Sequence, residues 1–68
     1  MSANKAMKEA RLGADLSQQQ LADRVGVSRQ TIHAIEKGDY NPTIALCIGI
    51  CRVLGLTLND LFWEETEK

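Results

Sequence analysis

The sequence predicts a single all-helical domain of five short helices over residues 1–68. Four of its five glycines follow stretches of helical periodicity, where a left-handed residue commonly ends a helix: Gly13, Gly26, Gly38 and Gly55. No segment shows the alternation of apolar and polar residues that is typical of a half-buried strand. We therefore expect helices at about 4–12, 18–25 and 29–37, one more after residues 41–43 and another after residue 57.

Each of the four later helices is preceded by a side chain that can cap it. The candidates are Ser17, Ser28, Asn41 or Thr43, and Thr57. Gln20 stands three residues after Ser17, and Asp60 three residues after Thr57, so both pairs have the spacing of a capping box. Pro42 fits the first turn of the fourth helix or the entry to it.

The composition excludes several classes of protein. Cys47 and Cys51 are four residues apart in one apolar helical stretch, which favours small core residues in a reduced, cytoplasmic protein over a disulfide. The longest apolar stretch, Ile44 to Leu58, contains Arg52 and is too short to span a bilayer. A chain of this length buries only about 60% of its unfolded surface, so we expect oligomerisation to add stability.

Charge alone does not indicate a partner. The formal net charge is -1, but an acidic tail at about 63–68 follows a slightly basic remainder. His33 is the single histidine and lies among exposed positions, so the sequence offers neither a metal site nor a nucleophile paired with a base. We expect no enzyme activity and no cofactor.

The second and third expected helices form a helix-turn-helix. Only Gly26, Val27 and the capping Ser28 separate them, and Ala22 is small where the helices cross. The apolar residues Val27, Ile32 and Ile35 can fix the crossing, which leaves the side chains of Arg29, Gln30 and His33 facing outward. In a helix-turn-helix, hydrogen-bonding side chains at the start of the second helix of the motif reach base edges when that helix lies in the major groove.

The stretch from Ser17 to Ile32, followed by Ile35-Glu36-Lys37-Gly38 and Asn41-Pro42, closely resembles the phage Cro and repressor (Xre-type) helix-turn-helix family. The resemblance covers about residues 7–62 and is to the short, stand-alone branch of that family. It implies a compact five-helix, lambda-repressor-like domain with the helix-turn-helix at about 17–37. It also implies dimerisation, with a short strand around residues 62–65 as one option for the tail.

The resemblance implies two sets of DNA contacts and one structural pair. The base-contact set is Ser28, Arg29, Gln30, His33 and Ala34; for His33, exposure to solvent alone is an equal alternative. The phosphate-contact set is Ser17, Gln18, Lys37, Tyr40, Asn41 and Thr43, with Gln18 also bracing the third helix. Asp39 stands where relatives are often basic, which weakens the expected phosphate contacts nearby. Arg11 and Glu36 are expected to form an ion pair between the first and third helices.

The fourth helix is apolar on two sides. Its core face is expected to be Ile44, Cys47, Cys51 and Leu54, whereas Leu46 and Val53 lie roughly opposite, with Gly49 beside them. Phe62 and Trp63 add large apolar side chains to an acidic end. We interpret the second set as a homodimer interface: Leu46, Gly49, Val53, Phe62 and Trp63. The alternative is that some of these side chains are simply exposed.

These observations predict a sequence-specific regulator of transcription that binds double-stranded DNA. The specific hypothesis is a homodimeric repressor on an inverted-repeat operator, whose signal arrives through an unidentified regulatory protein, protein concentration or a small molecule. The alternative is an antitoxin-like protein-interaction module with secondary DNA binding. The short tail after Phe62 disfavours that alternative without excluding it.

Overall fold

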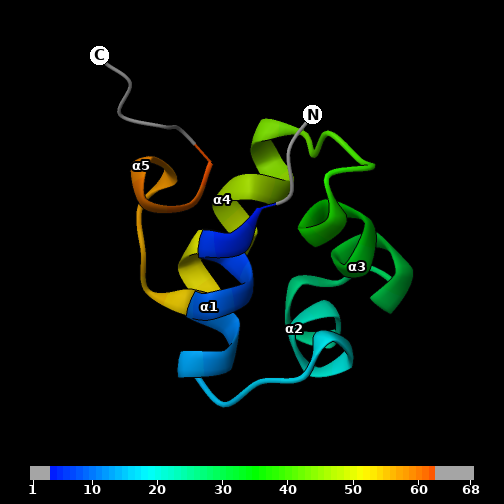
Figure 1. The fold of residues 1–68 in the computed structure, drawn as a ribbon, viewed down its shortest axis with the longest axis horizontal. Helices are drawn as coiled ribbons and strands as arrows, with labels where there is room; N and C mark the ends of the chain where they lie inside the picture. The colour runs from blue at the N-terminus through cyan, green and yellow to red at the C-terminus, as the bar shows by residue number, and fades with distance from the viewer. Residues whose placement is uncertain (1–3, 63–68) are drawn as a thin grey trace.

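The computed structural model describes residues 4–62, and these residues form five helices (Figure 1). The helices are α1 (Lys5–Gly13), α2 (Gln18–Val25), α3 (Arg29–Lys37), α4 (Ile44–Leu54) and α5 (Leu58–Leu61). No strand occurs between residues 4 and 62, so the all-helical fold class is confirmed there. Trp63, the acidic tail and most of the strand considered around residues 62–65 lie outside the described residues.

Each helix begins at a residue whose side-chain oxygen accepts a hydrogen bond from a backbone N–H in the first turn. The five caps are Asn4, Ser17, Ser28, Thr43 and Thr57. Both expected capping boxes form, at Ser17 and at Thr57. Of the two candidates before α4, Thr43 is the cap, and Pro42 therefore lies in the entry to the helix.

The helix ends confirm three of the four expected glycines and correct the fourth. Gly26, Gly38 and Gly55 have φ of 89°, 90° and 71°. Gly13 is instead the last residue of α1, and the left-handed residue is Asp15, with φ of 64°. Leu16 N donates to Arg11 O at 3.1 Å and Asp15 N to Leu12 O at 3.0 Å, which are the two bonds of a Schellman turn. Aspartate tolerates this conformation better than most residues.

The core lies where the helices meet. Its largest fully buried side chains come from four of them: Met7, Leu21, Ile32 and Ile50. Leu61 of α5 is also buried against this cluster. Helices α2 and α3 lie on one side of the molecule and α5 on the other, with α1 and α4 between them (Figure 1). The second and third helices are thus supported from behind, which leaves their opposite faces open.

The core face of α4 differs from the prediction. Ile50 is fully buried, whereas Ile44 is 59% exposed because it is the first residue of the helix, beyond the body of the core. Leu46 and Val53 are partly buried and pack against the core. A Cβ atom added to Gly49 would lie 3.5 Å from Val25 Cγ1. Part of the predicted dimer interface therefore faces α2 of the same chain.

Neither a membrane-spanning helix nor a metal-binding group of side chains occurs among the described residues. No helix between residues 4 and 62 is both long and apolar enough to cross a bilayer. Within the same range, histidine, cysteine and acidic side chains do not gather into a group that could hold a metal ion. Cys47 and Cys51 are buried free thiols.

Candidate nucleic-acid interface

The turn between α2 and α3 is tight because two backbone N–H groups share one carbonyl. Gly26 N and Val27 N both donate to Ala22 O, at 2.8 and 3.0 Å. The left-handed conformation of Gly26 turns the chain here, where a side chain would be strained. Ala22 and Ile32 are fully buried where the helices pack. The crossing of α2 and α3 is therefore held by both backbone bonds and core contacts.

The outward face of α3 carries the base-contact residues that the sequence predicts. Arg29, Gln30 and His33 are exposed, and Ala34 is partly buried beside them. Ser28 caps α3, since its hydroxyl accepts from Thr31 N at 3.2 Å and lies 3.0 Å from Thr31 Oγ1. The face thus presents guanidinium, amide and imidazole groups from the first half of the helix, while Ser28 Oγ is engaged within the chain.

Gln18, the first residue of α2, is hydrogen-bonded to three residues of α3. Its Nε2 lies 3.2 Å from His33 Nδ1 and donates to Glu36 Oε1, also at 3.2 Å. Its Oε1 accepts from Arg29 at 3.4 Å. The amide of Gln18 donates to both His33 and Glu36 when the imidazole proton of His33 is on Nε2, which leaves Nδ1 as an acceptor. In that tautomer Gln18 has to release one of these partners to hold a phosphate, because a phosphate oxygen only accepts hydrogen bonds.

Arg11 and Glu36 form a buried, bidentate ion pair between α1 and α3. The distances are 2.8 Å from Arg11 Nε to Glu36 Oε2 and 3.2 Å from the second guanidinium nitrogen to Oε1. The two residues are only 6% and 7% exposed. Arg11 also donates to Leu16 O at 2.8 Å. The pair joins α1 to α3 and, through Gln18, connects to the exposed face of the helix-turn-helix.

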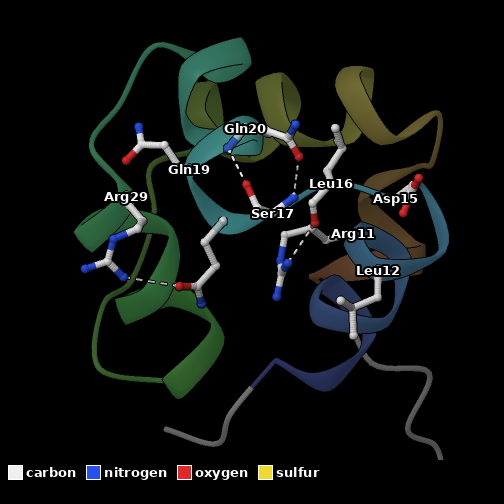
Figure 2. A pocket seen from close by; sticks show the side chains of 9 residues that line it. Arg11, Leu12, Asp15, Leu16, Ser17, Gln19, Gln20 and Arg29 are labelled. Atoms are coloured by element: carbon white, nitrogen blue, oxygen red, sulfur yellow. Dashed lines mark hydrogen bonds between the residues drawn. The ribbon is translucent and has the colours of Figure 1, made fainter.

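An open hollow of about 610 Å³ lies beside α3, at the start of α2 (Figure 2). Arg29 and Gln19 lie on one side of it, and Leu12 and Asp15 on the other. Ser17 is engaged in its capping box, with Ser17 N donating to Gln20 Oε1 at 2.8 Å. The positive end of the α2 dipole and the exposed charge of Arg29 favour an anion on the Arg29 side of this hollow, whereas the Asp15 carboxylate opposes one on the other side.

The last residue of α3 and the segment after that helix carry the remaining phosphate-contact residues. Lys37, Tyr40 and Asn41 are exposed, whereas the Thr43 hydroxyl accepts from Leu46 N at 3.1 Å as the cap of α4. Lys37 Nζ lies 3.4 Å from Asp39 Oδ2, and both side chains are more than half exposed. Asp39 therefore offsets part of the lysine charge.

The exposed apolar side chains differ from the expected interface set. Phe62 packs partly buried against the core, and Trp63 lies outside the described residues. On α4 the exposed large apolar side chains are Ile44 and Ile48, and Ile48 is 39% exposed. Ile48 is not among the predicted interface residues, although its spacing of four from Ile44 places both on one helix face.

Comparison with known proteins agrees with this geometry. A family model described as helix-turn-helix matches residues 7–61. The chain belongs to the helix-turn-helix family. Its resemblance to the Xre-type branch, stated from the sequence, is thereby confirmed, and it is a DNA-binding regulator of transcription and not an enzyme.

Relatives occur in bacteria, archaea and a phage. The chain is 46% identical over 62 residues to the uncharacterized HTH-type transcriptional regulator YgzD of Bacillus subtilis, covering 91% of this chain and 94% of that protein. It is 47% identical over 57 residues to an uncharacterized HTH-type transcriptional regulator of Methanothermobacter thermautotrophicus, covering 82% and 83%. Over 66 residues it is 30% identical to the immunity repressor protein of Bacillus phage phi105, covering 97% of this chain but 46% of the repressor.

A solved structure shares the fold. The restriction-modification controller protein C.AhdI from Aeromonas hydrophila superimposes with a TM-score of 0.75 over 78% of this chain and 80% of that one, at 24% sequence identity. At that identity the likeness supports the helical arrangement alone.

Proposed function

We propose that this regulator is a repressor that binds an inverted-repeat operator as a homodimer and reads its sequence through α3. The observation that carries the proposal is the outward face of α3, where Arg29, Gln30 and His33 are exposed while Glu36 on the same helix is anchored to buried Arg11. A reading helix needs exposed polar groups on a rigid support, and α3 combines the two. The proposed setting is the cytoplasm, where a prokaryotic operator lies.

The exposed groups match the edges of particular bases. A guanidinium such as that of Arg29 pairs with guanine O6 and N7, and an amide such as that of Gln30 pairs with adenine N6 and N7. Ala34 offers an apolar contact for a thymine methyl group. We assign Ser28 and His33 to the edge of this reading surface, since the Ser28 hydroxyl caps α3 and His33 is bonded to Gln18.

Phosphate contacts would flank the reading helix on both sides. Ser17 and Gln18 border the hollow at the start of α2, where the helix dipole favours an anion. Lys37 is the last residue of α3, Tyr40 and Asn41 lie beyond it, and Thr43 caps the start of α4. Contacts at both ends would fix the register of α3 along the groove without reading sequence themselves.

The partly exposed apolar side chains of α4 support the proposed homodimer. The proposed interface keeps the exposed parts of Leu46, Gly49 and Val53 on α4, together with Phe62 and Trp63. Repression by occupying the operator is supported by the similarity to the phi105 immunity repressor, which spans 97% of this chain. A dimer related by a two-fold axis reads an inverted repeat, because each protomer contacts one half-site.

The test is selection of bound duplexes from random DNA, combined with sedimentation of the free protein. We expect an inverted repeat whose half-site centres are about 34 Å apart, and a dimer at micromolar concentration. Val53→Glu should yield monomers, since it places a charge in the proposed interface. Enrichment of an isolated half-site by a monomeric wild-type protein would contradict the proposal, and failure to enrich any DNA would favour the antitoxin-like alternative.

A further inference from the structure

Asn4 joins three helices from its place just before α1. Its Oδ1 accepts a hydrogen bond from Met7 N at 3.0 Å and caps α1. Its Nδ2 donates to the carbonyl oxygen of Leu61, the last residue of α5, at 2.8 Å. Its backbone N–H donates to the carbonyl oxygen of Glu36, near the end of α3, at 3.0 Å. One residue therefore holds the ends of α3 and α5 against the start of α1.

The two carbonyl groups belong to residues at functionally important places. Glu36 forms the ion pair with Arg11 that anchors α3. Leu61 directly precedes Phe62, where the tail part of the proposed dimer interface begins. Leu61 is 5% exposed and Asn4 is partly buried, so water replaces a lost bond poorly at this point. Asn4 thus connects the reading helix directly to the segment that is proposed to contact the partner.

We propose that Asn4 is a positioning residue that sets the recognition helix of each protomer relative to the dimer interface. The inference rests on the proposed function, because it concerns a dimer on two half-sites. A change in the angle between α3 and the end of α5 alters the spacing of the two recognition helices. It does not alter the fit of one recognition helix to one half-site. Asn4 accordingly acts on binding to the whole operator and not on base reading.

The test compares two DNA duplexes, the selected inverted repeat and a duplex with one half-site. Asn4→Asp and Asn4→Ser both retain an oxygen that can cap α1, and neither retains the amide that donates to Leu61 O. We expect each variant to bind the inverted repeat about tenfold more weakly. Affinity for the single half-site should stay at the wild-type value. The serine variant separates loss of the bond from the added charge of aspartate.

A second readout is the tolerance of half-site spacing. One base pair inserted between the half-sites should weaken wild-type binding strongly and weaken binding of the Asn4 variants less, because their recognition helices are held less firmly. Ile50→Val is the matched control for lost stability. It trims a fully buried side chain in α4 and should leave the ratio of the two affinities unchanged.

Two different results would contradict the role of Asn4 and the proposed dimeric function. In the first, the Asn4 variants keep the wild-type ratio of affinities for the inverted repeat and the half-site and show only a lower Tm. That result would leave Asn4 as a helix cap alone and would overturn the inference. Wild-type protein that binds the inverted repeat no better than the half-site would overturn the dimeric function, and this inference with it.

Discussion

Arg11 and Glu36 form the buried ion pair that holds the reading helix in place. Removing one partner leaves a buried charge without compensation, which costs far more than losing an exposed pair. We expect Glu36→Ala to lower the free energy of unfolding by on the order of 3 kcal/mol, because Arg11 is 6% exposed. Urea unfolding measures this. Glu36→Gln is the matched control, since it retains the shape and an acceptor oxygen.

A double-mutant cycle tests whether the two charges act together. Changing Arg11 to methionine removes the guanidinium and keeps an apolar stem. The loss in the Arg11→Met, Glu36→Ala double variant should be clearly smaller than the sum of the two single losses. Additive losses would show that the pair contributes no coupling.

The two thiols of α4 are protected by burial. Burial raises the pKa of the Cys47 thiol, and for Cys51 the charges of Cys47 and Asp60 add to the effect of burial. Because the thiolate is the reactive form, iodoacetamide should label both residues slowly in the native protein at pH 8 and quickly in urea. Rapid labelling of the native protein would contradict the buried placement.

The same shift predicts how stability depends on pH. A thiol whose pKa is raised by folding contributes its full stability below the unfolded value, and that contribution is lost as pH rises toward the folded value. Thermal melting should therefore show falling stability above about pH 9, the ordinary value for these thiols. Replacing both cysteines by alanine should flatten this decline.

Sequence reasoning missed some of the contacts between distant residues. The family resemblance implied that Arg11 pairs with Glu36 and that Gln18 braces the third helix, but it named neither His33 as a partner of Gln18 nor any contact of Asn4. The bonds from Gln18 to His33 and from Asn4 to Leu61 join residues 15 and 57 positions apart. Neither leaves a pattern in the nearby sequence, because each depends on how whole helices pack.

At the scale of the helix, local chemistry determined what was predictable. The caps Ser17, Ser28 and Thr57 and the ends of α2 and α3 follow from residues within one turn, and they agree with the structure. The left-handed residue after α1 was expected two residues too early, at Gly13, because an aspartate, Asp15, takes the conformation that glycine usually adopts. Ile44 was wrongly assigned to the core because periodicity does not show where along a helix the core ends.

Gly49 gives a test of both the helix and the proposed interface. An alanine Cβ there would meet Val25 Cγ1 at 3.5 Å, which is an ordinary contact. Gly49→Ala should therefore raise the free energy of unfolding of the monomer by about 1 kcal/mol through helix propensity. If a partner packs against Gly49, the same substitution should weaken dimerisation in sedimentation experiments. Unchanged dimerisation would remove Gly49 from the interface, and lower monomer stability would contradict the packing of α4 on α2.

For the whole molecule, the order of five helices and the position of the helix-turn-helix were predictable from the sequence, since glycines, caps and apolar spacing agree along the chain. Which surface meets a partner was harder to predict. Leu46 and Val53 pack partly against the core of their own chain and stay partly accessible to a partner. Either kind of contact would favour an apolar residue at these positions. The sequence shows that these positions are apolar, but it does not distinguish packing within the chain from packing against a partner.

The central claim is that α3 reads bases while the residues around it hold the phosphate backbone. The most direct measurement compares Gln30→Ala with Lys37→Ala, using affinity for the operator and its single-base variants across a salt series. Gln30→Ala should cost about 1 to 3 kcal/mol per half-site and relax preference at particular base pairs. Lys37→Ala should weaken all sequences alike and reduce the salt slope by up to roughly 0.9 per lost contact, less where Asp39 already offsets the charge. Folding of each variant is checked first by thermal melting. If the two variants gave the same base preferences and the same salt slope, α3 would not be the reading element.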